Sequence, residues 1–222
     1  MKPIGYIESD FKEKFGIPRQ SGRARLCSRL IFYPEYRDPE ALRGLEDFSH
    51  IWLIFDCSKA HRDGFSPTVR PPRLGGNKRL GVFATRSPFR PNPIGLSAVK
   101  LIKIERTETL GETLILEGAD LLDGTPIFDV KPYLPHADCI LDASGGFSDA
   151  FVSYALSVDF SPALLEKIPP EKRRGLIDCL KDDPRPSYQT DEDREYGMKF
   201  DRFNVRFTVS GGVLTVIAVD EI

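Results

Sequence analysis

The residue types best suited to chemistry are gathered in one segment, Thr68–Leu96, whose sequence is TVRPPRLGGNKRLGVFATRSPFRPNPIGL. Proline fixes the backbone φ angle and lacks an amide donor, so the density of proline here predicts a stiff loop. A stiff loop presents guanidinium groups at low conformational cost, and these groups bind phosphates and carboxylates through paired hydrogen bonds. Gly75 and Gly76 permit positive φ or a close approach of the backbone. A solvent-exposed linker is the alternative, but the apolar residues Val82–Ala84 and Ile94 argue against it.

The charge of the chain is unevenly distributed along its length. Residues 62–106 hold ten lysines and arginines against two acidic residues, a net charge of +8. Residues 1–61 carry +1 and residues 107–222 carry −11, although the whole chain carries only −2. A local excess of this size indicates an anionic partner at the central segment, although a solvated basic face explains the charge alone equally well.

The composition is that of an ordinary globular protein, with 41% hydrophobic and 29% charged residues. No apolar run approaches the roughly 18 residues of a membrane span, and the N-terminus lacks the pattern of a signal peptide. The four cysteines are widely separated and the three histidines form no ligand-like pair, so neither a disulfide framework nor a metal site is expected. We therefore predict a cytoplasmic protein that holds no metal and no membrane anchor.

Short strands are predicted to dominate the first 135 residues. Apolar or alternating runs predict strands at 4–7, 25–33, 51–55, 80–85, 96–106 and 112–118. Asp38 followed by Pro39 predicts the start of a short helix that ends at Leu45. No GxGxxG motif lies between a strand and a helix, so a dinucleotide-binding sheet is not indicated, and an all-β barrel is.

The pattern changes at the small, glycine-rich run 143–147, which predicts a boundary between a β-barrel at 1–142 and a second domain at 143–222. The second part has a strand near 154–160 and helices over 162–168 and 170–180. It ends in two apolar runs that flank Ser-Gly-Gly, a hairpin signal. We predict a small α+β C-terminal domain.

Several blocks of the sequence resemble the signature blocks of the TsaA/TrmO-like family. They are PRQ (18–20), RGLEDFSHIW (43–52), RPPRLGG (70–76), GVFATRSPFRPNPIGLS (81–97) and DGTPIFDVKPYLP (123–135). The tail from residue 183 resembles the extension of bacterial members. The resemblance implies a mainly β protein, a single-sheeted antiparallel β-barrel that binds S-adenosylmethionine as a homodimer. The reaction implied is methylation of N6 of N6-threonylcarbamoyladenosine at position 37 of tRNA, beside the anticodon.

The resemblance also carries the contacts to S-adenosylmethionine onto this sequence. They fall on Pro18, Arg19, Gln20, Ser58, Lys59, Arg86, Leu96, Asp123, Gly124, Thr125 and Pro126. The carboxylate of the cofactor suits a guanidinium such as that of Arg86, and Asp123 suits the ammonium or the ribose hydroxyls. Taken alone, Asp123–Pro126 is also the pattern of a plain turn, and Leu96 is also explained by core packing.

The acceptor nitrogen is a poor nucleophile because its lone pair is delocalised into the purine and the carbamoyl group. A side chain that orients this nitrogen or takes its proton would help, and Asn92 and Asp129 are the catalytic candidates. Each has a structural alternative. Asn92 stiffens the turn between Pro91 and Pro93, and Asp129 pairs with Lys131.

An anticodon stem-loop would be bound by cations and aromatic rings. The cations expected to contact phosphates are Arg70, Arg73, Lys78, Arg79 and Arg90. The rings expected to stack on an unpaired base are Phe89, Tyr133 and Phe147, although core packing explains each of them as well. In the C-terminal part, RNA contacts or packing are expected from Arg185, Tyr188 and Arg206.

Two other functions stay open. One is a non-catalytic RNA-binding module, in which the basic loop clamps a backbone, and bound S-adenosylmethionine would argue against it. The other is a small-molecule methyltransferase of the same family, which analysis of the modified nucleosides of tRNA would distinguish.

Overall fold

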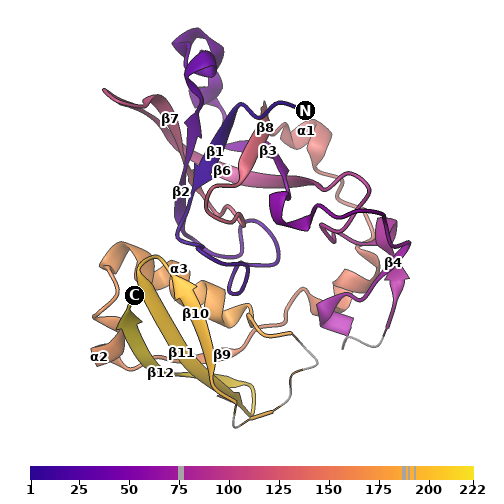
Figure 1. Ribbon diagram of the computed structural model, residues 1–222, viewed down its shortest axis with the longest axis vertical. Helices are drawn as coiled ribbons and strands as arrows, with labels where there is room; N and C mark the ends of the chain where they lie inside the picture. The colour runs from indigo at the N-terminus through magenta and orange to yellow at the C-terminus, as the bar shows by residue number, and fades with distance from the viewer. Residues whose placement is uncertain (75–77, 187–188, 190, 193) are drawn as a thin grey trace.

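The computed structural model describes residues 1–74, 78–186, 189, 191–192 and 194–222. Gly75, Gly76 and Tyr188, which the sequence singles out, lie outside the described residues. Strands form two larger sheets and one short hairpin, and most of the helices are a single turn (Figure 1). The prediction of a mainly β chain is therefore confirmed.

Six strands of the N-terminal part form one antiparallel sheet that closes on itself. They are β1 (Gly5–Glu8), β2 (Cys27–Phe32), β3 (His50–Asp56), β6 (Ile94–Thr107), β7 (Gly111–Glu117) and β8 (Pro126–Pro132). The hydrogen-bonded order is β1-β2-β7-β6-β3-β8, and β8 pairs back with β1 to close a barrel (Figure 1). Alternate residues point inward, so that Ile51 and Leu53 of β3 are fully buried. The apolar interior is what holds the six strands around one core.

The 14-residue strand β6 connects Thr68–Leu96, called the basic segment below, to the barrel wall. At its start it runs beside β3, where Ile94 lies opposite Asp56, and at its end it runs beside β7. A bulge between Leu101 and Lys103 lets this long strand bend from one partner to the other. The last residues of the basic segment are thus fixed at the end of β3.

The chain between β3 and β6 is folded into small elements. They are η4 (Ser58–Ala60), β4 (Thr68–Val69), η5 (Pro72–Leu74), β5 (Leu80–Gly81) and η6 (Val82–Ala84). The strand predicted at 80–85 is wrong beyond its first two residues. Both the amide and the hydroxyl of Thr85 donate to the carbonyl of Val82, which closes a 3-10 turn instead.

Two 3-10 turns replace the short helix that the sequence predicts between Asp38 and Leu45. After η1 (Pro34–Tyr36), η2 (Pro39–Leu42) begins as expected, with the Asp38 carboxylate accepting a hydrogen bond from the amide of Glu40 at 3.0 Å. Gly44 then adopts φ 82°, a left-handed conformation that ends the turn, and η3 (Leu45–Asp47) follows. The predicted cap was right and the predicted length was wrong.

The second larger sheet lies in the C-terminal part, below the barrel in Figure 1. Its strands are β9 (Ser157–Asp159), β10 (Tyr196–Phe200), β11 (Phe203–Ser210) and β12 (Val213–Glu221), in the order β10-β11-β12-β9. The β11–β12 hairpin turns at Gly211 and Gly212, both with positive φ, as the Ser-Gly-Gly motif predicts. Two helices, α2 (Pro162–Leu165) and α3 (Pro170–Lys181), accompany this sheet, and α1 (Pro135–Asp138) and η7 (Gly146–Phe151) lie on the connection from the barrel.

The loop between β1 and β2, residues 9–26, belongs to the barrel in sequence but packs into the C-terminal core. Phe11 and Leu26 are buried in the same apolar cluster as Leu176 of α3. Gly175 of α3 allows this approach, because a β-carbon there would lie 2.3 Å from the Leu26 side chain. Residues 9–26 therefore lie between the two parts of the molecule, with each of their ends fixed in a barrel strand.

Candidate functional site

The loop 9–26 contacts three of the sequence blocks that were predicted to bind the cofactor. The guanidinium of Arg86 donates to the side-chain carbonyl of Gln20 at 2.6 Å, although the two residues are 66 positions apart. From the same loop, the ammonium of Lys14 donates to the backbone carbonyl of Lys59 at 2.9 Å. These contacts bring Gln20, Lys59 and Arg86 to one side of the barrel, around a loop that the C-terminal core supports.

The turn Asp123–Pro126 is held against the end of β1. The carboxylate of Asp123 accepts from the amide of Ser9 at 2.9 Å and pairs with the ammonium of Lys12 at 2.9 Å. Gly124 has φ 74° and donates its amide to the carbonyl of Ile7, while Thr125 is buried. The backbone of this motif is therefore a turn, as its sequence alone suggests. The carboxylate of Asp123 is positioned by Ser9 and Lys12, which belong to the same loop as Gln20.

Ser58, Lys59 and Leu96 lie at one end of the β3–β6 ladder. Ser58 and Lys59 are exposed in η4, which begins two residues after β3 ends. Leu96 is 55% exposed on β6 and pairs with Ile54 of β3, so core packing does not explain it. An exposed leucine beside a polar loop offers the apolar contact that a flat ring system needs.

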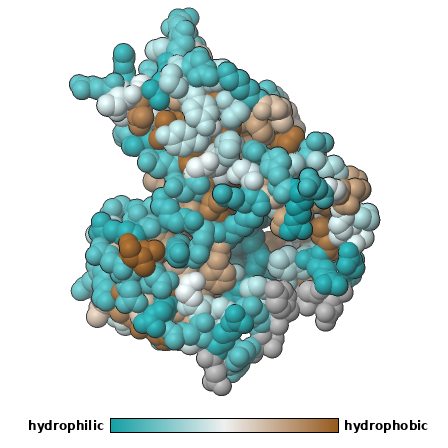
Figure 2. Space-filling model, viewed as in Figure 1, coloured by the Kyte–Doolittle hydropathy of each residue, from teal (hydrophilic) through white to brown (hydrophobic). Residues whose placement is uncertain are grey.

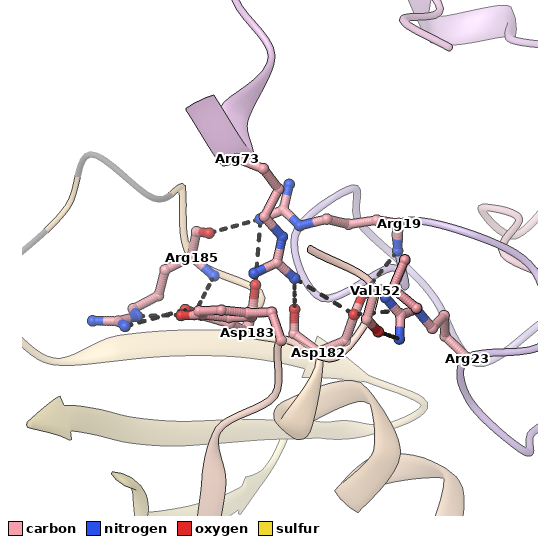
Figure 3. A network of polar contacts seen from close by, with 8 residues as sticks. Arg19, Arg23, Arg73, Val152, Asp182, Asp183 and Arg185 are labelled. Carbon is pink, nitrogen blue, oxygen red and sulfur yellow. Dashed lines mark hydrogen bonds and ion pairs between the residues drawn. The ribbon is translucent and has the colours of Figure 1, made fainter. Parts of the chain in front are cut away.

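Pro18 and Arg19 turn toward the C-terminal part rather than toward Arg86. Pro18 is buried, and the backbone amide of Arg19 donates to the carboxylate of Asp182 at 3.1 Å (Figure 3). The guanidinium of Arg19 donates to the backbone carbonyl of Arg185 at 2.8 Å. Burial, together with the nearby positive charge of Arg73, lowers the pKa of Arg19. The side chain of Arg19 thus lies in a buried polar network. Of the three residues of the PRQ block, only Gln20 lies beside Arg86.

Arg73 is part of the same network and is not presented to solvent. Its side chain is only 14% exposed, and its guanidinium donates to the backbone carbonyl of Asp182 at 2.6 Å (Figure 3). The guanidinium also lies 4.3 Å from the centre of the Tyr154 ring. The hydroxyl of Tyr154 in turn donates to the carboxylate of Asp183 at 2.8 Å. Arg73 therefore meets carboxylates of its own chain where the sequence predicted phosphates.

The other predicted RNA-binding cations are divided between two environments. Arg70, Lys78 and Arg79 are exposed on or beside the β4–β5 hairpin, and the Nε of Arg79 donates to the Thr68 hydroxyl at 2.8 Å. Arg90 instead donates to the backbone carbonyl of Thr85 at 2.7 Å and to that of Val82, which braces η6.

The predicted C-terminal cations and the predicted stacking rings are mostly engaged by neighbours. Arg185 pairs with Asp183, and Arg206 pairs with Glu195 and Asp220. Arg62 lies 3.8 Å from the ring centre of Phe89, and Tyr133 packs against Trp52, so neighbours occupy two of the predicted platforms. Phe147 is half-buried in η7.

The two catalytic candidates differ in their surroundings. Asn92 is exposed, and its backbone carbonyl accepts from the amide of Ile94. Asp129 pairs with Lys131 at 2.9 Å, which is the structural alternative that the sequence left open. Asp129 lies opposite Ile54, and Ile54 lies opposite Leu96, so the three form one row across β8, β3 and β6. Side chains in such a row share a face of the sheet, which puts Asp129 about 10 Å from Leu96.

A carboxylate that the sequence did not single out, Asp120, lies close to this site. It follows β7 and accepts a hydrogen bond from the buried hydroxyl of Ser97 at 2.7 Å. Burial raises the pKa of Asp120, while the bond from Ser97 and the positive charge of Arg86 oppose that effect. Ser97 was the available signal, because a polar residue at an inward position of β6 requires a partner.

Known proteins share both parts of this architecture. The family described as tRNA-methyltransferase O N-terminal domain matches residues 6–139, and the TrmO C-terminal domain matches residues 153–222. The chain belongs to the tRNA-methyltransferase O (TrmO) family. An Escherichia coli TrmO relative, named tRNA (adenine(37)-N6)-methyltransferase, is 41% identical over 98% of this chain and 96% of its own length.

Two further comparisons cover different shares of this chain. The crystal structure of TrmO from Pseudomonas aeruginosa is 35% identical with a TM-score of 0.76, covering 98% of this chain and 97% of that one. An S-adenosyl-L-methionine-binding protein of Archaeoglobus fulgidus is 39% identical over 145 residues, which make up 65% of this chain and 96% of that protein. Nearly all of the archaeal relative is thus aligned, whereas about a third of this chain lies outside that alignment.

Neither a membrane span nor a metal cluster is found in the part of the chain that the structure describes. No helix there is long and apolar enough to cross a membrane. Within the same residues, no three His, Cys, Asp or Glu side chains are grouped to hold a metal ion.

The polar groups gathered around the loop 9–26 are of the kind that fits a ligand with a carboxylate and an ammonium group.

Proposed function

We propose that this TrmO-family enzyme transfers a methyl group from S-adenosylmethionine to N6 of N6-threonylcarbamoyladenosine at position 37 of tRNA. The observation that carries the proposal is the hydrogen bond between Gln20 and Arg86, because it joins two blocks that the family resemblance assigns to one cofactor site. The contacts of the same loop with Lys59 and Asp123 support it. The E. coli relative, a tRNA (adenine(37)-N6)-methyltransferase by name, supports the choice of substrate.

Four of the proposed cofactor residues have roles that their chemistry suits. The Arg86 guanidinium would hold the carboxylate of the amino-acid end, and Gln20 would keep that guanidinium in place. Asp123 would hold the ammonium or the ribose hydroxyls, and the exposed side chain of Leu96 would contact the adenine. S-adenosylmethionine supplies an activated methyl group, so the protein needs mainly to orient the acceptor, which can contribute about 7–11 kcal/mol.

We propose Asn92 and Asp129 as the groups that orient the acceptor nitrogen, with Asp129 available once its pairing with Lys131 is exchanged for the substrate. Asp129 lies in the row that contains Leu96, which favours it. Among the predicted RNA-binding cations, the exposed Arg70, Lys78 and Arg79 are the ones that we propose to contact phosphates. Arg73 and Arg90 are held by oxygens of the protein and would act by fixing their loops.

We further propose that residues 1–142 form a single-sheeted barrel domain that binds the cofactor. Residues 143–222 would be a C-terminal domain that supports the loop 9–26. The homodimer and the cytoplasmic location implied by the family are part of the same proposal.

The decisive experiment is methyl transfer from labelled S-adenosylmethionine to threonylcarbamoylated tRNA, with unmodified tRNA as the comparison. Methylation of the modified tRNA alone is expected. Binding of tRNA without any binding of S-adenosylmethionine would favour the RNA-binding module. Binding of the cofactor, with position 37 unchanged in tRNA from a deletion strain, would favour a small-molecule methyltransferase.

Calorimetry with the Arg86→Gln variant tests the cofactor site itself. Loss of a charge-assisted bond worth about 1.5–3 kcal/mol should raise the Kd for S-adenosylmethionine by about 10-fold or more. The matched control is Arg79→Gln, since Arg79 is an exposed arginine of the same segment. An equal effect of both changes would assign the loss to general charge and reject the site.

A further inference from the structure

Two phenylalanines at the base of the β4–β5 hairpin stack on one another in solvent. Phe65 is 51% exposed and Phe83 is 71% exposed, and their ring centres are 6.1 Å apart with an angle of 26° between the planes. The amide of Val82 donates to the carbonyl of Pro67 at 2.9 Å. This hydrogen bond joins the two chain segments that carry the rings, because Pro67 is two residues after Phe65 and Val82 directly precedes Phe83. The pair is thus held in place by the backbone while the rings remain accessible.

The exposed carboxylate of Asp63 lies two residues before Phe65, and from there to Glu105 every charged residue of the sequence is a cation. The guanidinium of Arg90 lies 5.6 Å from the ring centre of Phe83, and Arg70 and Arg79 are exposed on the hairpin. Exposed rings among exposed cations are the combination with which proteins bind single-stranded nucleic acid, since each base has a face that stacks and each phosphate a charge to neutralise.

We propose that Phe65 and Phe83 form a stacking platform for an unpaired nucleobase that neighbours the methylated nucleotide. This inference rests on the proposed tRNA substrate and identifies the surface that holds it. Phe83 lies three residues before Arg86, so the Cα atoms of the two residues are at most about 11 Å apart. A base stacked on Phe83 would therefore hold its neighbour within reach of that site.

A second copy of the chain is the competing occupant of this surface. In a two-fold symmetric contact the same patch faces itself, so its cations would meet cations. Such like-charge pairing is unfavourable, whereas an RNA backbone complements the patch. The charge of the surface therefore favours RNA.

The test uses three substitutions at one exposed position of the full-length enzyme. Phe83→Ala and Phe83→Leu both remove the aromatic face, and Phe83→Tyr keeps it. Loss of one stacked base should raise the KM for threonylcarbamoylated tRNA by about 10-fold in the first two variants. The tyrosine variant should remain close to wild type, and the Kd for S-adenosylmethionine should be unchanged in all three. Phe65→Ala should show a weaker loss in the same direction.

Ile217→Ala is the matched control, because Ile217 is 42% exposed on β12 of the other sheet and should leave the tRNA KM unchanged. An unchanged tRNA KM in Phe83→Ala would overturn the platform while leaving the methyltransferase proposal intact. A wild-type KM in Phe83→Leu, together with a shifted monomer–dimer equilibrium of Phe83→Ala in ultracentrifugation, would assign the surface to a second copy. If the wild-type enzyme methylates no tRNA, the Kd of these variants for the tRNA still tests the platform independently of the methyltransferase proposal. A Kd that is unchanged in Phe83→Ala would then overturn the platform.

Discussion

Two sets of arginines carry the same charge in opposite surroundings. The junction arginines, Arg19 and Arg73, lie where the two parts of the molecule meet, and the hairpin arginines, Arg70 and Arg79, lie on or beside the β4–β5 hairpin. Arg73 is mostly buried and bound to Asp182, whereas Arg70, only three residues earlier, is exposed. Figure 2 shows that much of the visible surface is hydrophilic, so exposure alone does not set the hairpin apart. The difference lies in the partners, because the acidic C-terminal part supplies the carboxylate and carbonyl oxygens that hold Arg73 at the junction.

This difference separates stability from binding within one basic segment. A buried ion pair leaves an uncompensated charge when one partner is removed, at a cost of about 3–5 kcal/mol. An exposed pair contributes about 0–1 kcal/mol, because water and salt screen it. The junction arginines should therefore maintain the fold and its loops, and the hairpin arginines should be available to a ligand.

Asp182→Asn should have the largest effect of the changes considered. Asp182 accepts the amide of Arg19 and lies within ion-pair distance of Arg73 and Arg23, at 3.5 and 3.7 Å. We expect a loss of about 3 kcal/mol in the free energy of unfolding, measured in urea. The Kd for S-adenosylmethionine should also rise, because Arg19 adjoins Gln20.

Asp178→Asn provides the control for that experiment. Asp178 also links α3 to the loop 9–26, through an ion pair with Arg25 at 2.8 Å. The side chain of Asp178 is only 10% exposed, close to the 7% of Asp182, but that of Arg25 is 44% exposed, against 14% for Arg73. We expect a loss of about 1 kcal/mol or less and an unchanged Kd for the cofactor. Equal losses in the two variants would remove the distinction between the buried and exposed arginines.

Gly175→Ala tests how tightly the loop is packed between the two parts. The added β-carbon would lie 2.3 Å from the Leu26 side chain and 2.8 Å from the backbone carbonyl oxygen of Arg25. The carbonyl cannot rotate away, so we expect a loss of about 1–3 kcal/mol in the free energy of unfolding. Helix propensity alone predicts a gain for this change, so a more stable variant would show that α3 does not press on the loop.

Asp183 and Asp120 should respond to pH with opposite signs. Burial alone would raise the pKa of Asp183, but the ion pair with Arg185 and the hydrogen bond from Tyr154 lower it overall. Its stabilisation is therefore present above its ordinary pKa and is lost as the pH falls through the lowered value. Asp183→Asn, which tolerates the observed φ of 51°, should be less stable than wild type at pH 7 and approach it in acid.

Asp120→Asn should show the reverse behaviour. Because burial raises the pKa of Asp120, the unfolded chain gives up this proton at a lower pH than the folded chain does. Ionised Asp120 therefore costs stability at neutral pH, and the asparagine should relieve that cost while still accepting from Ser97. Urea unfolding from about pH 7 to about pH 3 should show a gain that disappears in acid. A variant less stable than wild type at every pH would mean that the carboxylate is needed by Arg86.

Replacing Arg70 and Arg79 by glutamine should have the smallest effect on stability. We expect a change within about 0.5 kcal/mol, because both side chains are exposed. The affinity for tRNA should fall, and the slope of log K against log salt should decrease by about 0.7 for each phosphate that the variant no longer neutralises. Arg73→Gln should instead lower the free energy of unfolding with little change in that slope.

Sequence reasoning predicted the barrel strands better than the contacts between distant parts. Strands at 4–7, 51–55 and 112–118 were found within about two residues, because apolar alternation is a local property. β8 and β10 were missed as strands. β8 has prolines at both ends, which mask its pattern, and β10 has Gly197 within an otherwise alternating run.

The candidate site was predictable in its residues and not in its geometry. The motif blocks identified Gln20 and Arg86, but their contact spans 66 residues and depends on the closed barrel. The burial of Arg73 depends on Asp182, which is 109 residues away and belongs to the C-terminal part. The sequence around an arginine next to proline does not show whether the partner of that arginine is a phosphate or a distant carboxylate. The acid–base environment of Asp120 was equally invisible, because it arises from Ser97 and from burial.

The placement of the loop 9–26 between the barrel core and the C-terminal core has a thermodynamic consequence. A ligand that tightens this loop must also tighten the sheet against which Phe11 and Leu26 pack, since the same residues serve both. Linkage is reciprocal, so a firmly folded C-terminal sheet strengthens donor binding by the same factor by which the donor protects that sheet. Amide hydrogen exchange in β10 and β11 would thus report whether the methyl donor is bound to the enzyme.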